Sequence, residues 1–367
     1  MIQKHNFLIL KEYNQISFFT FIHPTQTIKH QIMIRIATWN IEHFNNYFND
    51  DNSVKTTAEA VEKFTAISEI LNNHLQADII GIVEAPNTTT TTGNQDGVKK
   101  LENFAQTYGL ATTKAKQGFI SRGTQELIFL YNPNTITSLT HRPTGSTTST
   151  TTNPKFDSEF HFDADDDNIK EIYEHYRPPF EAKVEINGEE YWLMLVHAKS
   201  KGIFDSVDQI HLERLSRRNR LKLFAECSWI RQRIEKWLDS GKKVIVMGDI
   251  NDGPGMDLYE MRYGKSAVET IMGDIFEPQK LLINHLGRPK YGAYGWEPAS
   301  ASFKDRITED YINVLIDHIL VSQNVNIIAG SARVWNPYQA STGDPIKSQR
   351  DLFRTASDHY PVSIDLP

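Results

Sequence analysis

Side chains suited to acid–base and metal chemistry recur where apolar runs of this sequence stop. In chain order they are Asn40, Glu42, Glu84, His197, Asp249, Asn251, Asp317, Asp358 and His359. Hydrolysis of a phosphate ester needs such groups, because a cation must neutralise the phosphate oxygens, a base must generate hydroxide, and donors must stabilise the transition state. Hard oxygen ligands favour Mg²⁺ or Mn²⁺. Each residue alone is explained by a turn, a cap or a core position; their repetition favours a site.

Apolar, β-branched runs of the sequence predict buried strands, and these strands must position the polar side chains. The runs are 34–41, 78–83, 126–131, 191–197, 243–247, 318–321 and 361–364. A hairpin is predicted where 182–186 and 189–196 flank Asn187-Gly188, because this pair supplies the positive φ angles of a tight turn. Strands and helices recur without an evident linker, which favours one α/β domain over residues 33–367.

Two long helices are predicted between the strands, over about 57–75 and about 211–238. The second has one apolar stripe that includes Cys227. Its other face is expected to be a solvated surface, with a phosphate-facing role at its N-terminal end as the lesser alternative. That face carries Arg214, Arg217, Arg218, Arg220, Arg231 and Arg233.

Three polar segments are predicted to be surface loops. Two are the threonine-rich tracts 88–92 and 144–152, which lack the periodicity of a core element. The third is the acidic run 163–167. It lacks the glycine and the final glutamate of an EF-hand, so a solvated turn is expected there.

Six short motifs follow one another in an order that resembles the endonuclease/exonuclease/phosphatase superfamily, closest in style to its bacterial nuclease-like members. They are Thr38-Trp39-Asn40-Ile41-Glu42, Ile82-Val83-Glu84, Val196-His197-Ala198-Lys199-Ser200, Gly248-Asp249-Ile250-Asn251, Asp317-His318-Ile319-Leu320 and Ser357-Asp358-His359-Tyr360-Pro361-Val362. The resemblance extends from about residue 34 to the end of the chain. It implies a four-layer α/β sandwich, in which two packed mixed β-sheets are flanked by helices and the active site lies at one edge.

The resemblance also implies roles for the acidic residues. Glu84 would be the principal metal ligand, with Glu42 and Asp358 close to the same or a second Mg²⁺ or Mn²⁺ ion. Asp249 would orient or deprotonate the attacking water. Asn251 would donate to the developing negative charge.

The remaining roles concern the phosphate. His359 would contact the scissile phosphate, oriented by Asp317, because a carboxylate beside an imidazole favours its protonated form. His197 would be a second phosphate-contacting histidine or a general acid. Asn40 would hold a ligand or the phosphate by hydrogen bonding. Phosphate clamps are expected from two cations, Arg177 and Lys199.

The motifs favour a metal-dependent hydrolase, and an endonuclease acting on nucleic acid leads. A phosphatase or phosphodiesterase acting on a small ester or a phospholipid head group is the alternative, since the same core residues serve all of these substrates. A zinc hydrolase, a serine hydrolase and a non-catalytic binding module are weaker alternatives, because no His-Glu-x-x-His or Gly-x-Ser-x-Gly motif occurs and every expected position is filled. A basic and aromatic rim for DNA is a minority interpretation of Lys290, Tyr291, Tyr294, Trp296 and Lys304.

Composition sets outer bounds on these interpretations. The net charge of −7 argues against a nonspecific nucleic-acid coat, although a local basic groove remains compatible with it. Cys227 is the only cysteine, which excludes an intrachain disulfide and a cysteine zinc cage. No apolar run reaches the roughly 20 residues of a membrane span. Residues 1–32 are expected to be a poorly ordered extension, or to precede a true start at Met33. A cytoplasmic monomer is expected.

Overall fold

The computed structural model describes residues 32–89, 94–147, 153–203, 209–253, 261, 264–286, 298–304 and 311–367. Two six-stranded mixed sheets form its centre. The first contains, in spatial order, β15 (Arg333–Val334), β16 (Val362–Leu366), β1 (Ile34–Asn40), β2 (Ile79–Ala85), β4 (Glu126–Tyr131) and β3 (Lys114–Gln117). The second contains β11 (Leu282–Asn284), β14 (Asp317–Ser322), β10 (Lys243–Asp249), β9 (Glu189–His197), β8 (Phe180–Ile186) and β5 (Leu139–His141).

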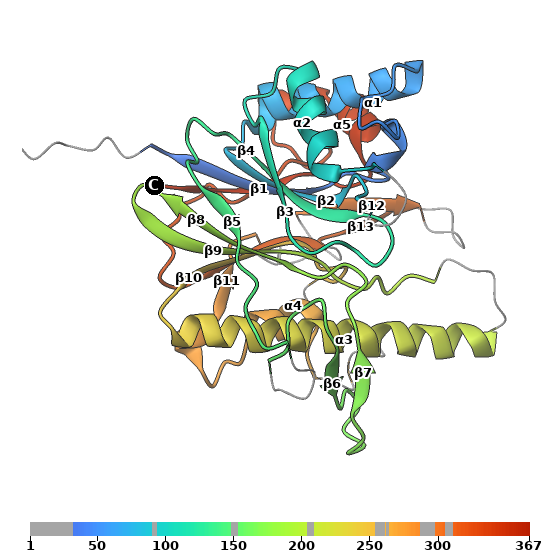
Figure 1. Cartoon of the computed structure of the whole chain (residues 1–367), viewed down its shortest axis with the longest axis vertical. Helices are drawn as coiled ribbons and strands as arrows, with labels where there is room; N and C mark the ends of the chain where they lie inside the picture. The colour runs from blue at the N-terminus through green and yellow to red at the C-terminus, as the bar shows by residue number, and fades with distance from the viewer. Residues whose placement is uncertain are drawn as a thin grey trace, which may run out of the picture. The chain divides into compact units, whose positions relative to one another are not determined.

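Helices cover the outer face of each sheet and complete four layers (Figure 1). Over the first sheet lie α1 (Ala58–Glu69), α2 (Gly97–Thr107) and α5 (Arg350–Ala356), and over the second lie α3 (Gln209–Asp239) and α4 (Ala267–Met272). Two strand pairs stand outside the sheets: β6 (Phe160–Phe162) with β7 (Glu171–Tyr173), and β12 (Ala301–Lys304) with β13 (Tyr311–Val314). The predicted four-layer α/β sandwich is therefore confirmed.

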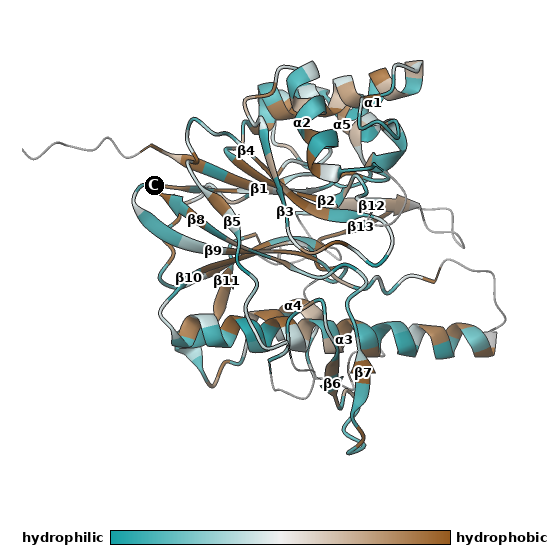
Figure 2. Cartoon of the chain, in the orientation of Figure 1, coloured by the Kyte–Doolittle hydropathy of each residue, from teal (hydrophilic) through white to brown (hydrophobic). Residues whose placement is uncertain are grey.

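Apolar side chains of the central strands point alternately to the two faces of each sheet, and both faces are covered as a result. On β9, Leu193 and Leu195 pack in the core between the sheets, whereas Met194 and Val196 pack with residues of α3 and α4. Side chains alternate between faces with a period of two, so a strand buried on both faces reads as a continuous apolar run. Figure 2 shows these strands as the hydrophobic centre of the molecule. Each fully buried large aliphatic side chain stabilises the fold by roughly 1.5–3 kcal/mol.

A parallel strand pair lies at the centre of each sheet. β1 pairs with β2 in the first sheet, and β9 pairs with β10 in the second. Parallel neighbours require a crossover, which the segments containing α1 and α3 provide. Since β1 also packs against β10, the carboxyl ends of all four strands meet at one edge. The predicted site residues were expected at these strand ends.

Two arginines that were expected on the exposed face of the second long helix are buried instead. Arg233 is fully buried and pairs with Glu181 of β8. Arg231 is 7% exposed and donates to the backbone carbonyls of Ile271 and Met272. The prediction was wrong for these two residues because buried acceptors from β8 and α4 satisfy them, and helical periodicity does not reveal such acceptors.

Residues Ile32–Pro367 form one compact unit. In the part of the chain that the structure describes, no helix combines the length and the apolar character needed to cross a bilayer. The acidic run 163–167 is a bend in which Asp165, Asp166 and Asp167 are exposed, Ala164 is buried, and the Asp163 carboxylate accepts from the backbone N–H of Asn168 at 2.8 Å. Several sequence predictions lie outside the described residues: the extension before residue 32, most of both threonine tracts, Lys290, Tyr291, Tyr294, Trp296 and the side chain of Lys304.

We expect Arg233→Met to lower the free energy of unfolding by about 3–5 kcal/mol, because the Glu181 carboxylate would remain buried without its cation. Burial already raises the pKa of Glu181, so the loss should shrink at acidic pH, where the carboxyl group is protonated. Urea denaturation at pH 5 and pH 8 measures both effects. The double variant with Glu181→Met should regain much of the stability. Equal losses in the single and double variants would contradict this account.

Candidate active site

A cleft of about 540 Å³ opens at the edge where β1, β2, β9 and β10 end. All but two of the predicted site residues line it: Asn40, Glu42, Glu84, Arg177, His197, Asp249, Asn251, Asp358 and His359. Of the other two, Asp317 contacts His359 from the side of the second sheet, and Lys199 does not line the cleft.

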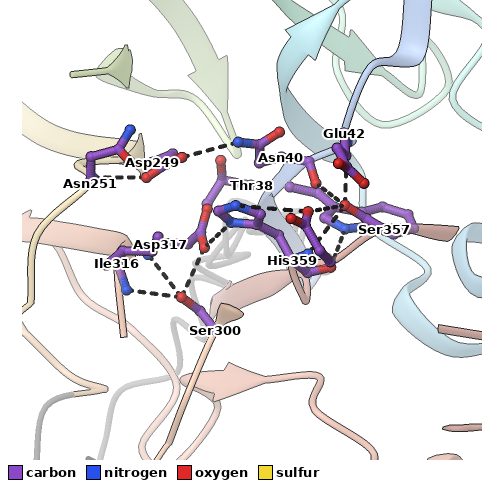
Figure 3. Close-up of polar contacts among 12 residues, drawn as sticks. Thr38, Asn40, Glu42, Asp249, Asn251, Ser300, Ile316, Asp317, Ser357 and His359 are labelled. Carbon is purple, nitrogen blue, oxygen red and sulfur yellow. Dashed lines mark hydrogen bonds and ion pairs between the residues drawn. The ribbon is translucent and has the colours of Figure 1, made fainter. Parts of the chain in front are cut away.

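Asp249 ends β10 and is held by donors on both carboxylate oxygens (Figure 3). The side-chain amide of Asn40 donates to Oδ2 at 3.0 Å, and the backbone N–H of Asn251 donates to Oδ1 at 2.8 Å. Burial raises the pKa of Asp249, and the negative charge of Asp317 raises it further. A carboxylate with a raised pKa accepts a proton more readily near neutral pH. Asp249 is therefore suited to act as a base.

His359 lies just before β16, and its ring is fixed by a carboxylate. Nδ1 is 2.7 Å from Oδ2 of Asp317, and the same oxygen accepts from the hydroxyl of Ser300 at 2.8 Å. Burial disfavours the charged ring. The attraction of Asp317, supported by Asp249 and Asp358, outweighs that effect and raises the pKa of His359 to about 10. The imidazolium keeps Nε2 as its remaining donor.

His197 ends β9 and has the opposite electrostatic setting. Burial lowers its pKa well below the usual range, and the positive charges of Arg177 and His359 lower it further. Its Nε2 is 3.7 Å from Oδ2 of Asp249. A neutral imidazole donates one hydrogen bond and holds no extra proton to give away. This setting suits contact with phosphate better than the general-acid role that was the other expectation for His197.

The first acidic group, formed by Asp249 and Asp317 with His359, is engaged in protein hydrogen bonds. Single ligand atoms of Asp249, Asp317 and His359 lie within 4.8 Å of one another, a spacing that a metal ion requires. However, both oxygens of Asp249 accept hydrogen bonds, and Asp317 Oδ2 accepts from His359 and Ser300. Coordination here would displace those donors, so this group fits a hydrogen-bonded acid–base pair better than a cation.

The second acidic group consists of Glu42, Glu84 and Asp358. Their oxygens do not all come within 4.8 Å of one another, but burial raises the pKa of Glu42 and the charges of Asp358 and Glu84 contribute to that rise. Repulsion of this kind is what a divalent cation relieves. The buried Oδ1 of Asn40, which also lines the cleft, has no hydrogen-bond partner among the described residues. These oxygen donors fit a hard divalent cation.

Backbone conformation helps to place Glu84 at the end of β2. Its φ is 58°, and the pairing of β2 with β4 shifts register between Ile82 and Ala85. A non-glycine residue with positive φ is held there by its surroundings at an energetic cost of order 1–3 kcal/mol. The backbone N–H of His43 donates to Oε2 of Glu84 at 3.1 Å, which fixes the carboxylate.

The two expected phosphate clamps differ in position. Arg177 lines the cleft, where its guanidinium hydrogen bonds to Gln125. The backbone N–H of Lys199 donates to the Glu226 carboxylate at 2.8 Å, and Lys199 is not part of the cleft lining. Lys201 lines the cleft instead and forms an ion pair with Asp252.

Sequence reasoning missed two serines that hold the site together. The Ser357 hydroxyl donates to the carbonyl of Asn40 at 2.8 Å and accepts from the backbone N–H of His359 at 3.2 Å. Ser300 holds Asp317 and, through its hydroxyl oxygen, also accepts the backbone N–H of Asp317 at 2.9 Å. Ser357 was visible as part of a motif, whereas Ser300 carries no sequence signal.

The sequence also did not single out Phe303, a cleft-lining residue whose ring centroid is 5.6 Å from that of His359.

Comparison with known proteins adds a likeness in fold. No family model matches the chain, and no curated protein matches it either. Among solved structures, humanized D. rerio TDP2 is 11% identical, with 91% of this chain and 99% of that chain covered and a TM-score of 0.46. The 3′ phosphatase NExo from Neisseria, bound to a product DNA hairpin, is 13% identical, with 91% and 99% covered and a TM-score of 0.43.

A third solved structure is an endonuclease/exonuclease/phosphatase family protein from Bacteroides thetaiotaomicron. It is 13% identical, with 91% of this chain and 97% of that chain covered and a TM-score of 0.40. At these identities the likeness concerns the fold alone.

We expect the Asp317–His359 contact to make stability depend on pH. Because the pKa of His359 is raised from 6.5 to about 10, its stabilising contribution is fully present below pH 6.5 and is lost as pH rises through about 10. The unfolding free energy, measured by denaturant titration in EDTA, should fall less over this range in Asp317→Asn than in the wild type. Asp351→Asn, on the exposed surface of α5, serves as the control. If the unfolding free energy fell equally with pH in the wild type and in Asp317→Asn, the Asp317–His359 contact would not be the cause of the pH dependence.

Proposed function

We propose that this protein is a divalent-metal-dependent phosphoesterase that hydrolyses phosphodiester bonds of nucleic acid, acting as an endonuclease. The observation that carries the proposal is the pairing of two opposite groups in one cleft. Asp249 is a buried carboxylate with a raised pKa, and His359 is a buried imidazole held in its charged form. A base and a cationic donor in one cleft match the needs of water attack on a phosphate.

Each role follows from the contacts of these side chains. Asp249 accepts a proton from the attacking water, while Asn40 and Asn251 hold its two oxygens in place. The water oxygen forms a bond to phosphorus as the bond from phosphorus to the ester oxygen breaks, and the departing oxygen takes up a proton from solvent. His359 donates from Nε2 to a phosphate oxygen, because its Nδ1 is engaged by Asp317. Charge that develops on the phosphate is thereby met by a fixed donor.

Glu42, Glu84 and Asp358 would hold Mg²⁺ or Mn²⁺ on the other side of the cleft. When bound, such a cation supplies positive charge that neutralises phosphate oxygens. Arg177 adds a protein cation close to the same place, since its guanidinium is within electrostatic reach of Glu84 and Asp249. His197, as a neutral donor, contributes hydrogen bonding without adding charge.

One wall of the cleft favours a substrate that has more than a phosphate. Phe303, Val314 and Ile316 line the cleft, and Phe303 is 36% exposed. An apolar wall offers nothing to phosphate oxygens but packs against a sugar or a base, and a base stacks on an aromatic ring. This observation supports a nucleotide-containing substrate over an inositol phosphate. A small phosphate ester or a phospholipid head group remains the alternative.

The test compares supercoiled plasmid with bis-p-nitrophenyl phosphate and inositol phosphates, each with Mg²⁺, Mn²⁺ or EDTA. Wild type should nick plasmid only with metal. His359→Ala should lower kcat by about 10²–10⁴-fold, because the phosphate loses its cationic donor. His161→Ala, which removes an imidazole outside the cleft, is the matched control and should retain activity.

Each outcome of that test has a distinct meaning. Cleavage of the small esters alone would move the protein to the phosphatase alternative. Nicking that survives EDTA would refute the metal requirement. A folded protein that cleaves none of these substrates with either metal would contradict the proposal and favour a binding module.

We expect Phe303→Ala to raise KM for oligonucleotides by about tenfold, because loss of base stacking weakens binding by roughly 1–3 kcal/mol per base. The rate on bis-p-nitrophenyl phosphate should change little. Steady-state kinetics on both substrates separate the effects. Phe303→Trp should restore binding of the oligonucleotide, whereas equal losses on both substrates would assign Phe303 a purely structural role.

A further inference from the structure

A second cavity has a volume of about 510 Å³. One side is formed by β7 and the segment that follows it, and the other side by residues 218–222 of α3. In Figure 1, β7 crosses α3 and extends away from it, on the outer side of the second sheet. Arg218 and Lys222 of α3 line one side of this cavity, and Arg122 also lines it. These three cations lie outside the catalytic cleft and have no part in the proposed hydrolysis.

The second cavity shares a wall with the catalytic cleft. Tyr176 lines the cavity, and the next residue, Arg177, lines the cleft. The backbone N–H of Arg122 donates to the carbonyl of Tyr176 at 2.9 Å, and that of Thr124 donates to the Tyr176 hydroxyl at 3.2 Å. Gln125, one residue further on, lines the cleft. The second cavity therefore lies next to the cleft, with the Tyr176–Arg177 segment between them.

Positively charged side chains extend from the cleft to the second cavity. Burial lowers the pKa of the Lys199 ammonium; Glu226 opposes this, and the positive charges of Lys222, Arg177 and Arg218 add to the lowering. Lys199 thus lies within electrostatic reach of a cation in the cleft and of two cations in the second cavity. Cations this close to one another repel, which an anionic ligand relieves.

Protein carboxylates only partly compensate these cations. Arg122 is paired with Glu174 at 2.7 Å, whereas Arg218 has no ion-pair partner among the described residues. Lys222 is 3.8 Å from Glu226, but burial raises the pKa of Glu226 to about 7, so its negative charge is incomplete near neutral pH. Asp165 and Glu171 line the hairpin side of the cavity. An anion would therefore be held on the α3 side.

A buried neutral imidazole lines the same cavity. His175 is 2% exposed, and its Nε2 has no hydrogen-bond partner among the described residues. Its ring packs against Phe156 and Trp229. An unsatisfied buried polar atom costs about 1–3 kcal/mol, which calls for an explanation. A bound polar group in the cavity would supply one.

We propose that the second cavity binds a phosphate of the substrate remote from the scissile one. The substrate is then a nucleic-acid strand that runs from the cleft past Lys199 to Arg218 and Lys222. This inference rests on the proposed function and narrows it, since a mononucleotide or a small ester cannot occupy both places. It also accounts for Lys199, which lies outside the cleft lining but within electrostatic reach of Arg177, Arg218 and Lys222.

The test uses the full chain with Arg218→Ala and Lys222→Ala combined. The matched control combines Arg217→Ala and Lys236→Ala, which removes the same charge from exposed positions of α3 that do not line the cavity. Binding of fluorescent single-stranded DNA and RNA oligonucleotides is followed by anisotropy in EDTA at several salt concentrations. The rate of bis-p-nitrophenyl phosphate hydrolysis is measured in parallel with metal.

We expect the cavity variant to raise Kd at least tenfold over the control variant, for DNA, RNA or both. The slope of log K against log salt should become shallower by about 0.7 for each lost phosphate contact. Hydrolysis of the small ester should remain within about twofold of wild type. Equal Kd and salt slope in the cavity and control variants would overturn the inference, as would a wild type that binds neither oligonucleotide. Lack of hydrolysis of every ester would refute the proposed function, while the binding comparison would still decide this inference.

Discussion

The hydrogen bond from the Asn40 amide to the Asp249 carboxylate crosses from the first sheet to the second at the edge where both parallel pairs end. The contact between His359 and Asp317 crosses between the same two sheets. Each contact needs the sheets at a fixed separation, which the core between them sets through residues such as Ile245 and Met247 of β10. Close-packed interiors tolerate little change in volume. The relative position of the Asp249 carboxylate and the His359 imidazole is therefore a property of the whole core.

Strained backbone at the same edge follows from this requirement. Glu84 and Asn251 both have positive φ, at 58° and 56°. Gly248 has a φ of 133°, and a Cβ there would lie 2.0 Å from the carbonyl oxygen of Val196. Only glycine allows β9 and β10 to approach so closely just before Asp249. The paired strands on either side hold these conformations, and the side chains are aimed into the cleft as a result.

The sequence predicted the centre of this structure well because strand ends combine two signals. A buried strand reads as an apolar run, and the polar residue that ends it stands out, as Glu84 and Asp249 do. The ordered motifs then implied that these ends meet. Most of the predicted residues do line one cleft, while their catalytic and metal-binding roles stay predictions.

What the sequence could not show depends on long-range contacts. Arg233 looked like a surface residue because its acceptor, Glu181, lies 52 residues away on another strand. Ser300 lies in no apolar run or motif, yet it fixes Asp317. The second cavity was hidden for the same reason: Arg122, His175 and Arg218 come from three separate segments. Periodicity describes one element at a time, and these features exist only between elements.

The position of β16 in the first sheet limits when that sheet can be completed as the chain is synthesised. β16 lies between β15 and β1, in contact with the centre of the sheet, although it follows every other strand along the chain. Asp358 and His359 lie on the segment that leads into it. A chain growing from its N-terminus thus presents Asp249 long before His359 exists. The first sheet can therefore be completed only after His359 has been made, and until then a nascent chain carries the Asp249 carboxylate without the His359 imidazole.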